Sequence, residues 1–375
     1  MAGIYIHVPF CKTRCIYCDF YTRTDLSLKE NYISALSKEI ELRKDYLAGE
    51  TVKTIYFGGG TPSQLSLYDF ERIFGAINNT YIVASDAEIT MEANPDDLTG
   101  TYLESLKVLP FNRLSIGVQS FDDNELKFLR RRHSAEKAKD AVRKAQSIGF
   151  NNISIDLMYG LPNQTMDIWK RNLEEAINLN IQHISSYHLI YEEGTRLYRL
   201  FKQGDVKAVD EDLSVAMFSV MIDTLSDAGF EHYEISNFAR NGLYSKHNSS
   251  YWLGDKYLGL GPAAHSYDGI NRAWNVASIK KYIEGIGQGK PAIETEYLDL
   301  STQYNDFILT GMRTMWGVNL IELEKRFGPK LNNYCMQNVR KYIEEGFVTN
   351  TDNRLKLTRK GIFISDGIMS DLMWV

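Results

Sequence analysis

The chain alternates between short runs of β-branched and aromatic residues and longer segments of helical periodicity, and this alternation constrains the fold more than any other feature. Six candidate strands follow one another in the first half of the chain, at residues 3–7, 52–57, 88–92, 113–118, 152–158 and 183–189. Such a pattern is typical of parallel strands joined by crossover helices. It predicts an α/β fold, a partial (β/α)6 barrel of the TIM type.

Helical periodicity fills the segments between these strands. In residues 28–47, apolar residues such as Tyr32, Leu36 and Ile40 recur at the spacing of one helix face. Further helices are expected at residues 67–77, 99–106, 135–148, 168–179 and 211–228. Because parallel strands of a barrel end at one rim, the loops that follow them should meet there and carry the functional residues.

The alternation of predicted strands and helices ends near residue 200. Residues 230–275 are rich in Gly, Asn and aromatic residues, too rich in turn formers for simple βα units. From about residue 296 the pattern is helical again, and residues 348–357 predict a short hairpin before a last helix. We therefore expect a core at residues 1–235, a connecting region at 236–290, and a mainly helical, winged-helix-like domain at 291–375.

Composition excludes several classes of protein. The net charge is −6, from 42 Lys and Arg against 48 Asp and Glu, and no basic block of five residues offers a surface for nucleic acid. No apolar run approaches the roughly 20 residues that span a membrane, and the N-terminus lacks the pattern of a signal peptide. We expect a cytoplasmic protein with no nucleic-acid partner and no membrane span.

Three of the four cysteines lie close together in the loop after the first strand, at Cys11, Cys15 and Cys18. A chain of 375 residues needs no disulfides for stability, so its thiols are free for chemistry. Three soft ligands so close indicate a metal site. Structural zinc would need a fourth ligand, normally from a second paired unit that the chain lacks. A disulfide between Cys15 and Cys18 would leave Cys11 unexplained, and unrelated buried cysteines are the remaining alternative.

Polar and glycine-rich segments follow the later strands. Gly58-Gly59-Gly60-Thr61-Pro62 is neither a dinucleotide fingerprint nor a P-loop, and its glycines either let the backbone approach a ligand or form an ordinary tight turn. Glu92, Gln119, Arg131 and Asp156 lie in or after the later strands. Any one of these polar residues alone would be explained as a cap of the next helix.

The spacing Cys-x-x-x-Cys-x-x-Cys after a strand resembles the cluster loop of the radical S-adenosylmethionine (SAM) superfamily. The segments MEANPDDL, RLSIGVQSF, LRRRHS and ISIDLMYGLPNQT resemble its oxygen-independent coproporphyrinogen III oxidase family. This resemblance implies a 4Fe-4S cluster on the three thiolates, with one iron open to the amino and carboxylate groups of SAM. The reduced cluster would pass an electron to the sulfonium and cleave SAM to a radical.

The resemblance also implies which residues hold SAM. Tyr5 and Tyr17 would flank the cluster and the adenosine, and Gly59, Gly60 and Thr61 would bind the methionine end. Ribose, amino and carboxylate groups would be reached by Glu92, Gln119, Arg131 and Asp156. Among these, Arg131 is the natural partner of the carboxylate, because a guanidinium offers a bidentate fork.

Two departures separate the chain from the decarboxylating oxidases. Phe20 stands where those oxidases carry a fourth cysteine, two residues after Cys18. Residues 247–252 read His-Asn-Ser-Ser-Tyr-Trp, within a block that resembles the heme-chaperone branch of the family, whose His-Asn-x-x-Tyr-Trp motif is associated with heme binding. That resemblance extends over essentially the whole chain.

The heme-chaperone resemblance implies a heme site at His247, Asn248, Tyr251 and Trp252. Imidazole is a common axial ligand of heme iron, and aromatic rings offer flat faces to a porphyrin. His7 and His265 are rival ligands, a histidine beside aromatic rings is often structural, and Arg240, Lys246 and Lys256 are the basic residues proposed for the propionates.

The expected function is that of a heme chaperone that passes heme to an acceptor hemoprotein, such as a membrane respiratory enzyme. The alternatives are a radical SAM oxidoreductase that modifies a tetrapyrrole and a zinc-stabilised interaction protein. A homodimer is left open.

Overall fold

The structure, a computed structural model, describes residues 2–375 and confirms the predicted α/β fold. All six expected strands are present and pair in parallel in chain order: β1 Ala2–Val8, β2 Val52–Gly59, β3 Val83–Ala93, β4 Arg113–Gln119, β5 Ile153–Tyr159 and β6 His183–His188. The helices that connect them are α1 Lys29–Leu42, α2 Leu67–Thr80, α3 Gly100–Leu106, α4 Asp123–Phe128, α5 Ala135–Ile148 and α6 Met166–Asn178.

Two of the helices that connect these six strands differ from the sequence expectation. The helix expected over residues 28–47 ends at Leu42, and the chain then turns through Ala48 and Gly49, both at positive φ. The short helix α4 has no counterpart among the expected helices, and Asp122 caps its N-terminus by accepting from the backbone N–H groups of Asn124 and Glu125.

Segments after β6 extend this sheet at both ends. On the β6 side, after α7 Arg196–Gln203 and α8 Glu211–Asp227, the antiparallel strands β7 Glu231–Glu234 and β8 Asn237–Ala239 are added. On the β1 side, β9 Lys256–Leu260 pairs in parallel with β1 and is followed by β10 His265–Tyr267, β11 Asn271–Asn275 and β12 Ile293–Tyr297. Within residues 2–375 the sheet therefore has twelve strands and ends at β12 and β7 without closing, so the barrel is partial.

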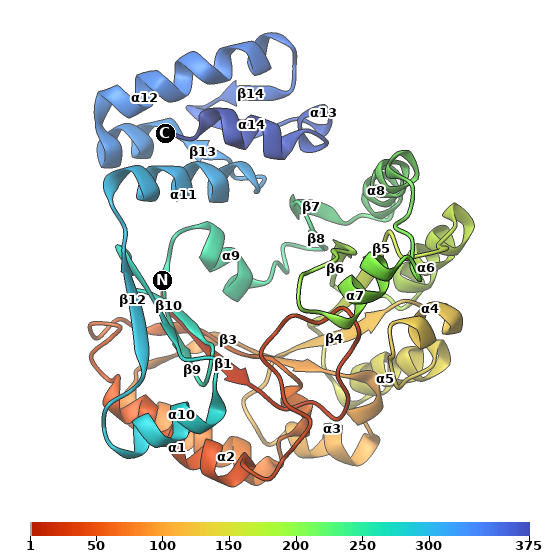
Figure 1. Cartoon of the computed structure of the whole chain (residues 1–375), viewed down its shortest axis with the longest axis vertical. Helices are drawn as coiled ribbons and strands as arrows, with labels where there is room; N and C mark the ends of the chain where they lie inside the picture. The colour runs from red at the N-terminus through yellow and green to blue at the C-terminus, as the bar shows by residue number, and fades with distance from the viewer. Residues whose placement is uncertain (1) are drawn as a thin grey trace.

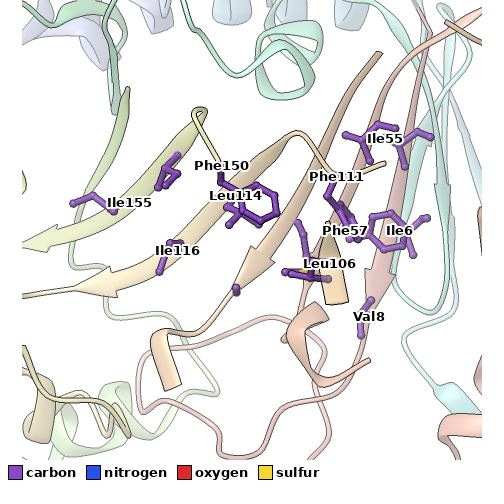
Figure 2. Packing of buried hydrophobic residues seen from close by; sticks show 14 of the residues in the cluster. Ile6, Val8, Ile55, Phe57, Leu106, Phe111, Leu114, Ile116, Phe150 and Ile155 are labelled. Atoms are coloured by element: carbon purple, nitrogen blue, oxygen red, sulfur yellow. The ribbon is translucent and has the colours of Figure 1, made fainter. Parts of the chain in front are cut away.

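The two faces of the barrel strands differ because successive side chains point to opposite sides. On the outer face, Ile6 and Val8 of β1 lie near Ile55 and Phe57 of β2 and Leu106 of α3 in the hydrophobic core under the helices (Figure 2). The inner face carries polar side chains instead. A polar interior cannot be explained by core packing alone, so the inner face is where a functional site is to be sought.

Strand register arranges the inner side chains in layers. Gly3 pairs with Thr54, and Thr54 with Glu88, near the start of the strands. His7 pairs with Gly58 near their carboxyl ends. The loop with the three cysteines leaves β1 at this second end, so the two ends of the barrel hold different groups.

The C-terminal unit has a core of its own. It consists of α11 Leu300–Met312, β13 Val318–Asn319, α12 Leu320–Glu344, β14 Val348–Thr351, β15 Arg354–Leu357, α13 Arg359–Ile362 and α14 Ser365–Leu372. The predicted hairpin is β14 and β15, and β13 joins it in a small sheet. Helix α9 Lys246–Trp252 lies between the large sheet and this unit, and α10 Ile279–Gly287 packs on α1 (Figure 1). In residues 2–375, every helix is too short or too polar to traverse a bilayer.

Candidate functional site

The cysteine loop is fixed at its base and at its tip. At the base, the backbone N–H of Cys11 donates to Arg23 O at 2.9 Å, and that of Arg23 donates to Pro9 O at 2.7 Å. At the tip, Ile16 is buried in a small apolar cluster with Leu161 and Leu197. The N–H of Leu197 also donates to Ile16 O at 2.9 Å. These contacts hold the thiols over the carboxyl ends of the strands.

The three thiols differ in burial. Cys11 is buried, whereas Cys15 and Cys18 are partly exposed, and all are free thiols. Burial raises the pKa of Cys11 and raises that of Cys18 to about 11. A bound iron–sulfur cluster would instead hold them as thiolates, since a coordinating thiol is deprotonated.

Among residues 2–375, no three His, Cys, Asp or Glu side chains lie close enough together to hold a metal ion as they stand. The donor set nevertheless fits the implied group, because three thiolates from one loop match a four-iron cluster with one open iron.

Hydrogen bonds connect two of the thiols through three polar side chains. Thr61 Oγ1 donates to Cys11 Sγ at 3.3 Å, and Asn94 Nδ2 donates to Thr61 Oγ1 at 3.3 Å. Arg131 donates to Asn94 Oδ1 and, through Nη1, to Cys15 Sγ at 3.3 Å. We call these residues the thiol network. It brings together the loops after β1, β2, β3 and α4 at one end of the barrel.

Sequence reasoning missed Asn94 as a member of this network. The family resemblance assigns Glu92, at the end of the third strand, and no residue of the segment that follows this strand. An amide that accepts from Arg131 and donates to Thr61 matches both partners, which a carboxylate could not do. The signal available in the sequence was the position of Asn94 directly after a strand, beside Pro95.

The glycine segment packs against the cysteine loop. Gly60 N–H donates to Val8 O and Thr61 N–H to Phe10 O, both at 2.8 Å. A Cβ at Gly59, where φ is +95°, would lie 2.5 Å from His7 Nδ1, and one at Gly60 would lie 2.6 Å from Val8 O. The close approach that these glycines allow is therefore to β1 and its loop.

Two partly exposed carboxyl groups, those of Glu92 and Asp156, lie inside the barrel near this end. Glu92 Oε1 accepts from the Tyr56 hydroxyl at 2.7 Å. Burial, with the nearby charge of Asp156, raises the pKa of Glu92 to about 7. Burial raises the pKa of Asp156 to about 6. Desolvation makes both carboxylates costly, so a cation placed between them would be favoured.

Gln119 and Arg131 line the same end. A Cβ at Gly117 would approach Gln119 Nε2 at 3.0 Å and Arg131 Nη2 at 3.3 Å, so both side chains lie beside that residue. Gln119 itself has a φ of +72°, an uncommon conformation for a residue other than glycine. Tyr17 packs on the apolar cluster at the loop tip, and burial raises its pKa.

His247 lies at the other end of the barrel, fully enclosed. The imidazole is 1% exposed, and its pKa is lowered to about 3 by burial and the charge of Arg113. Nδ1 is 2.8 Å from Thr54 Oγ1, Nε2 is 2.7 Å from the Tyr251 hydroxyl, and the ring stacks on Tyr56 at 5.1 Å. Both ring nitrogens are thus engaged, and iron could reach Nε2 only after the Tyr251 hydroxyl moved.

Two other residues of the α9 motif, Trp252 and Asn248, make contacts that do not involve His247. Trp252 lies under the guanidinium of Arg313 at 4.9 Å, and the backbone N–H of Asn248 donates to Ser245 Oγ at the helix start. Tyr5 provides the link between the two ends, because its ring lies 6.2 Å from that of Tyr56 and 6.4 Å from that of His247, while its hydroxyl lies 3.2 Å from His7 Nδ1.

The rival histidines differ in exposure. His7 is buried, with Nε2 2.9 Å from Tyr21 O, whereas His265 is exposed and stacks on Trp274 at 5.7 Å. The proposed propionate partners lie apart from one another. Arg240 stacks over Phe230, Lys256 pairs with Glu50 at 2.7 Å, and Lys246 is exposed at the start of α9.

A cysteine loop on a parallel partial barrel defines a radical SAM protein, and comparison with known families agrees. The family model described as "Radical SAM superfamily" matches residues 5–176, and one described as "HemN C-terminal domain" matches residues 298–364. The superfamily implies a 4Fe-4S cluster and SAM.

Proteins similar to this chain over nearly its full length identify its family within the superfamily. The chain is 34% identical to the heme chaperone HemW of Bacillus subtilis (strain 168), over 98% of each chain. It is 33% identical to HemW of Mycobacterium tuberculosis (strain ATCC 25618 / H37Rv), over 99% of this chain and 94% of the relative. The mouse mitochondrial radical S-adenosyl methionine domain-containing protein 1 is 32% identical, over 99% of this chain and 87% of the relative. The chain belongs to the HemW family.

One solved structure shares the whole fold. The coproporphyrinogen III oxidase HemN of Escherichia coli, described as a radical SAM enzyme, superposes with a TM-score of 0.85 at 23% identity, covering 99% of this chain and 90% of that one. The likeness confirms the architecture, including the mainly helical C-terminal region.

Proposed function

We propose that this protein is a heme chaperone: it binds a 4Fe-4S cluster, SAM and heme, and it transfers heme to an acceptor hemoprotein. The observation that carries the proposal is the near full-length similarity to heme chaperones in a chain that retains the three-thiol loop. The proposal places the protein in the cytoplasm and leaves open whether the acceptor is a membrane enzyme and whether the chaperone acts as a dimer.

In this proposal, Cys11, Cys15 and Cys18 hold the cluster. The thiol network supports the assignment, because Thr61 and Arg131 already donate to two of the three sulfurs. Hydrogen bonds from neutral and cationic donors stabilise thiolate ligands and tune the potential of a cluster.

SAM would lie between the cluster and the interior of the barrel. We assign its methionine end to Gly59, Gly60 and Thr61, its carboxylate to Arg131, and its remaining polar groups to Glu92, Gln119 and Asp156, with Tyr5 and Tyr17 beside the cluster and the adenosine. The two acids inside the barrel suit a ligand with a sulfonium and an ammonium group, because a cation beside each carboxylate offsets the desolvation that raises its pKa.

Anaerobic reconstitution tests the cluster and SAM together. Wild-type protein should take up four iron and four sulfide, and its electron paramagnetic resonance signal should change when SAM is added. Cys18→Ser should fail to assemble the cluster, whereas Cys335→Ser, a buried cysteine of the C-terminal core, should assemble it normally. Equal iron content in the two variants would contradict the assignment.

Heme transfer needs its own test. Heme-loaded protein should convert an apo-hemoprotein to its holo form faster than free hemin does in the presence of a heme-scavenging competitor. No transfer above the competitor control would refute the chaperone function.

A second candidate function is a radical SAM oxidoreductase acting on a tetrapyrrole, which the full-length likeness to HemN favours. Phe20 counts against it, because it occupies the place of the fourth cysteine of the decarboxylating oxidases, where its side chain is 59% exposed. Incubation of the reduced, cluster-loaded protein with coproporphyrinogen III and SAM discriminates the two. The chaperone predicts unchanged substrate, and vinyl products would establish the oxidase.

A further inference from the structure

A pocket of about 300 Å³ lies between α9, the added strands of the sheet and the C-terminal unit. Six aromatic side chains contribute to its lining: Tyr251, Trp252, Tyr257, Tyr267, Phe307 and Trp316. They come from three parts of the chain that are distant in sequence. Pockets of this size with mainly aromatic walls and a few polar groups are typical sites for small organic ligands.

Cationic side chains lie on the walls of the same pocket. Arg272 hydrogen-bonds Asp306 and lies 3.6 Å from Glu296, and Arg326 stacks over Phe307 at 5.2 Å, beside the Tyr267 hydroxyl. A third guanidinium, that of Arg354, donates to Trp316 O at 3.0 Å. With the carboxyl groups of Asp306 and Glu322, the lining carries three cations and two anions. The pocket therefore combines flat apolar faces with guanidinium groups that suit carboxylates.

The pocket also adjoins the enclosed histidine. Tyr251 contributes to its wall, and the hydroxyl of the same residue lies 2.7 Å from His247 Nε2. One movable side chain thus stands between the imidazole and the pocket. A ligand seated here would not need His247 in order to bind, although its metal would come close to the imidazole if Tyr251 rotated.

We infer that this interdomain pocket is the tetrapyrrole site: the macrocycle packs on the aromatic walls, and its carboxylates pair with Arg272 and Arg326. The inference rests on the proposed function and deepens it, because it locates heme between α9 and the C-terminal unit. It replaces Arg240, Lys246 and Lys256 as propionate partners, since none of those three lines the pocket.

The test compares two double variants in the anaerobically reconstituted protein. Arg272→Gln with Arg326→Gln removes two charges from the pocket, and Lys246→Gln with Lys256→Gln removes two charges near α9 but outside it. Binding of hemin and of metal-free protoporphyrin IX is followed by absorbance and by quenching of tryptophan emission. The pocket variant should bind both porphyrins roughly ten- to a hundredfold more weakly than the wild type, and the control variant should bind like the wild type.

Two further measurements separate binding inside the pocket from adsorption elsewhere on the surface. Thr310→Trp, on the α11 wall, should weaken both porphyrins by filling the space, with circular dichroism confirming that each variant is folded. The dimethyl ester of protoporphyrin, which lacks the carboxylates, should bind wild type and pocket variant alike.

The possible failures are distinguishable. A wild-type protein that binds no hemin overturns the proposed function and this inference with it. If wild type binds hemin but the pocket variant binds it equally well, or if metal-free protoporphyrin does not bind, the pocket is not the site while the chaperone function stands.

Discussion

The hydroxyl of Tyr251 lies 2.7 Å from Nε2 of His247, and the same tyrosine contributes to the wall of the interdomain pocket. Two residues one helical turn apart on α9 therefore have separate environments, one inside the barrel and one between the barrel and the C-terminal unit. The histidine of the heme-associated motif is held by the tyrosine of that motif. Any role of His247 as an iron ligand requires this contact to break first.

Tyr251→Phe should destabilise the protein by about 1–3 kcal/mol, because it leaves a buried imidazole nitrogen without its partner while retaining the ring. The midpoint of urea unfolding measures the effect. Tyr297→Phe is the matched control, since that tyrosine is 81% exposed and its hydroxyl can be replaced by solvent. Equal midpoints for the two variants would show that the contact with His247 contributes nothing.

His247 should make the stability depend on pH. Its folded-state pKa is lowered to about 3, whereas in the unfolded chain it is near 6.5, so below pH 6.5 only the unfolded chain takes up the proton. The contribution of neutral His247 to the free energy of unfolding is complete above pH 6.5. It falls by about 1.4 kcal/mol per pH unit on acidification towards pH 3. The difference in unfolding free energy between wild type and His247→Gln should therefore shrink from pH 6.5 to 4.5. A constant difference would show that the imidazole is protonated within the fold.

The parallel part of the sheet could be predicted from sequence because its signal is local. Each strand from β1 to β6 is a short apolar run beside a helical period, and the cysteine loop is marked by spacing alone. The added strands could not be predicted in the same way. Pairing of Ala2 with Lys256 joins two strands that are far apart in the sequence, and no local pattern of residues 256–260 specifies that partner.

The surroundings of His247 could not be predicted from sequence either. Sequence shows the histidine beside Tyr251 and Trp252 but does not show which other residues enclose it. Its burial comes from Thr54 and Tyr56 of β2, placed there by the barrel. The pocket was missed for a related reason, because its three arginines belong to segments that no motif connects.

SAM affinity should rise with pH through about 7. Burial raises the pKa of Glu92 to that value, and a ligand that carries a sulfonium and an ammonium group favours the ionised carboxyl. Below pH 7 the affinity should fall by up to about tenfold per unit, since binding must then displace a proton. Calorimetric titration of the reconstituted protein at pH 6, 7 and 8 measures this.

Glu92→Gln should bind SAM more weakly and lose most of this pH dependence, whereas Glu71→Gln, an exposed residue of α2, should keep the wild-type profile. If Glu92→Gln retained the wild-type slope, another group would be responsible for it.

Asn94→Ala should weaken SAM binding about tenfold without preventing cluster assembly. The amide connects Thr61 to Arg131, and these two residues donate to Cys11 and Cys15. Its loss removes a contact that positions the guanidinium, to which we assign the carboxylate of SAM. A positioning role predicts normal iron and sulfide content, a smaller SAM-induced change in the paramagnetic signal, and partial rescue by Asn94→Gln. Asn78→Ala, exposed on α2, is the control. Loss of the cluster itself in Asn94→Ala would instead mean that the network assembles the iron site, and unchanged SAM affinity would mean that Gly117 O and Cys15 Sγ hold Arg131 in position without Asn94.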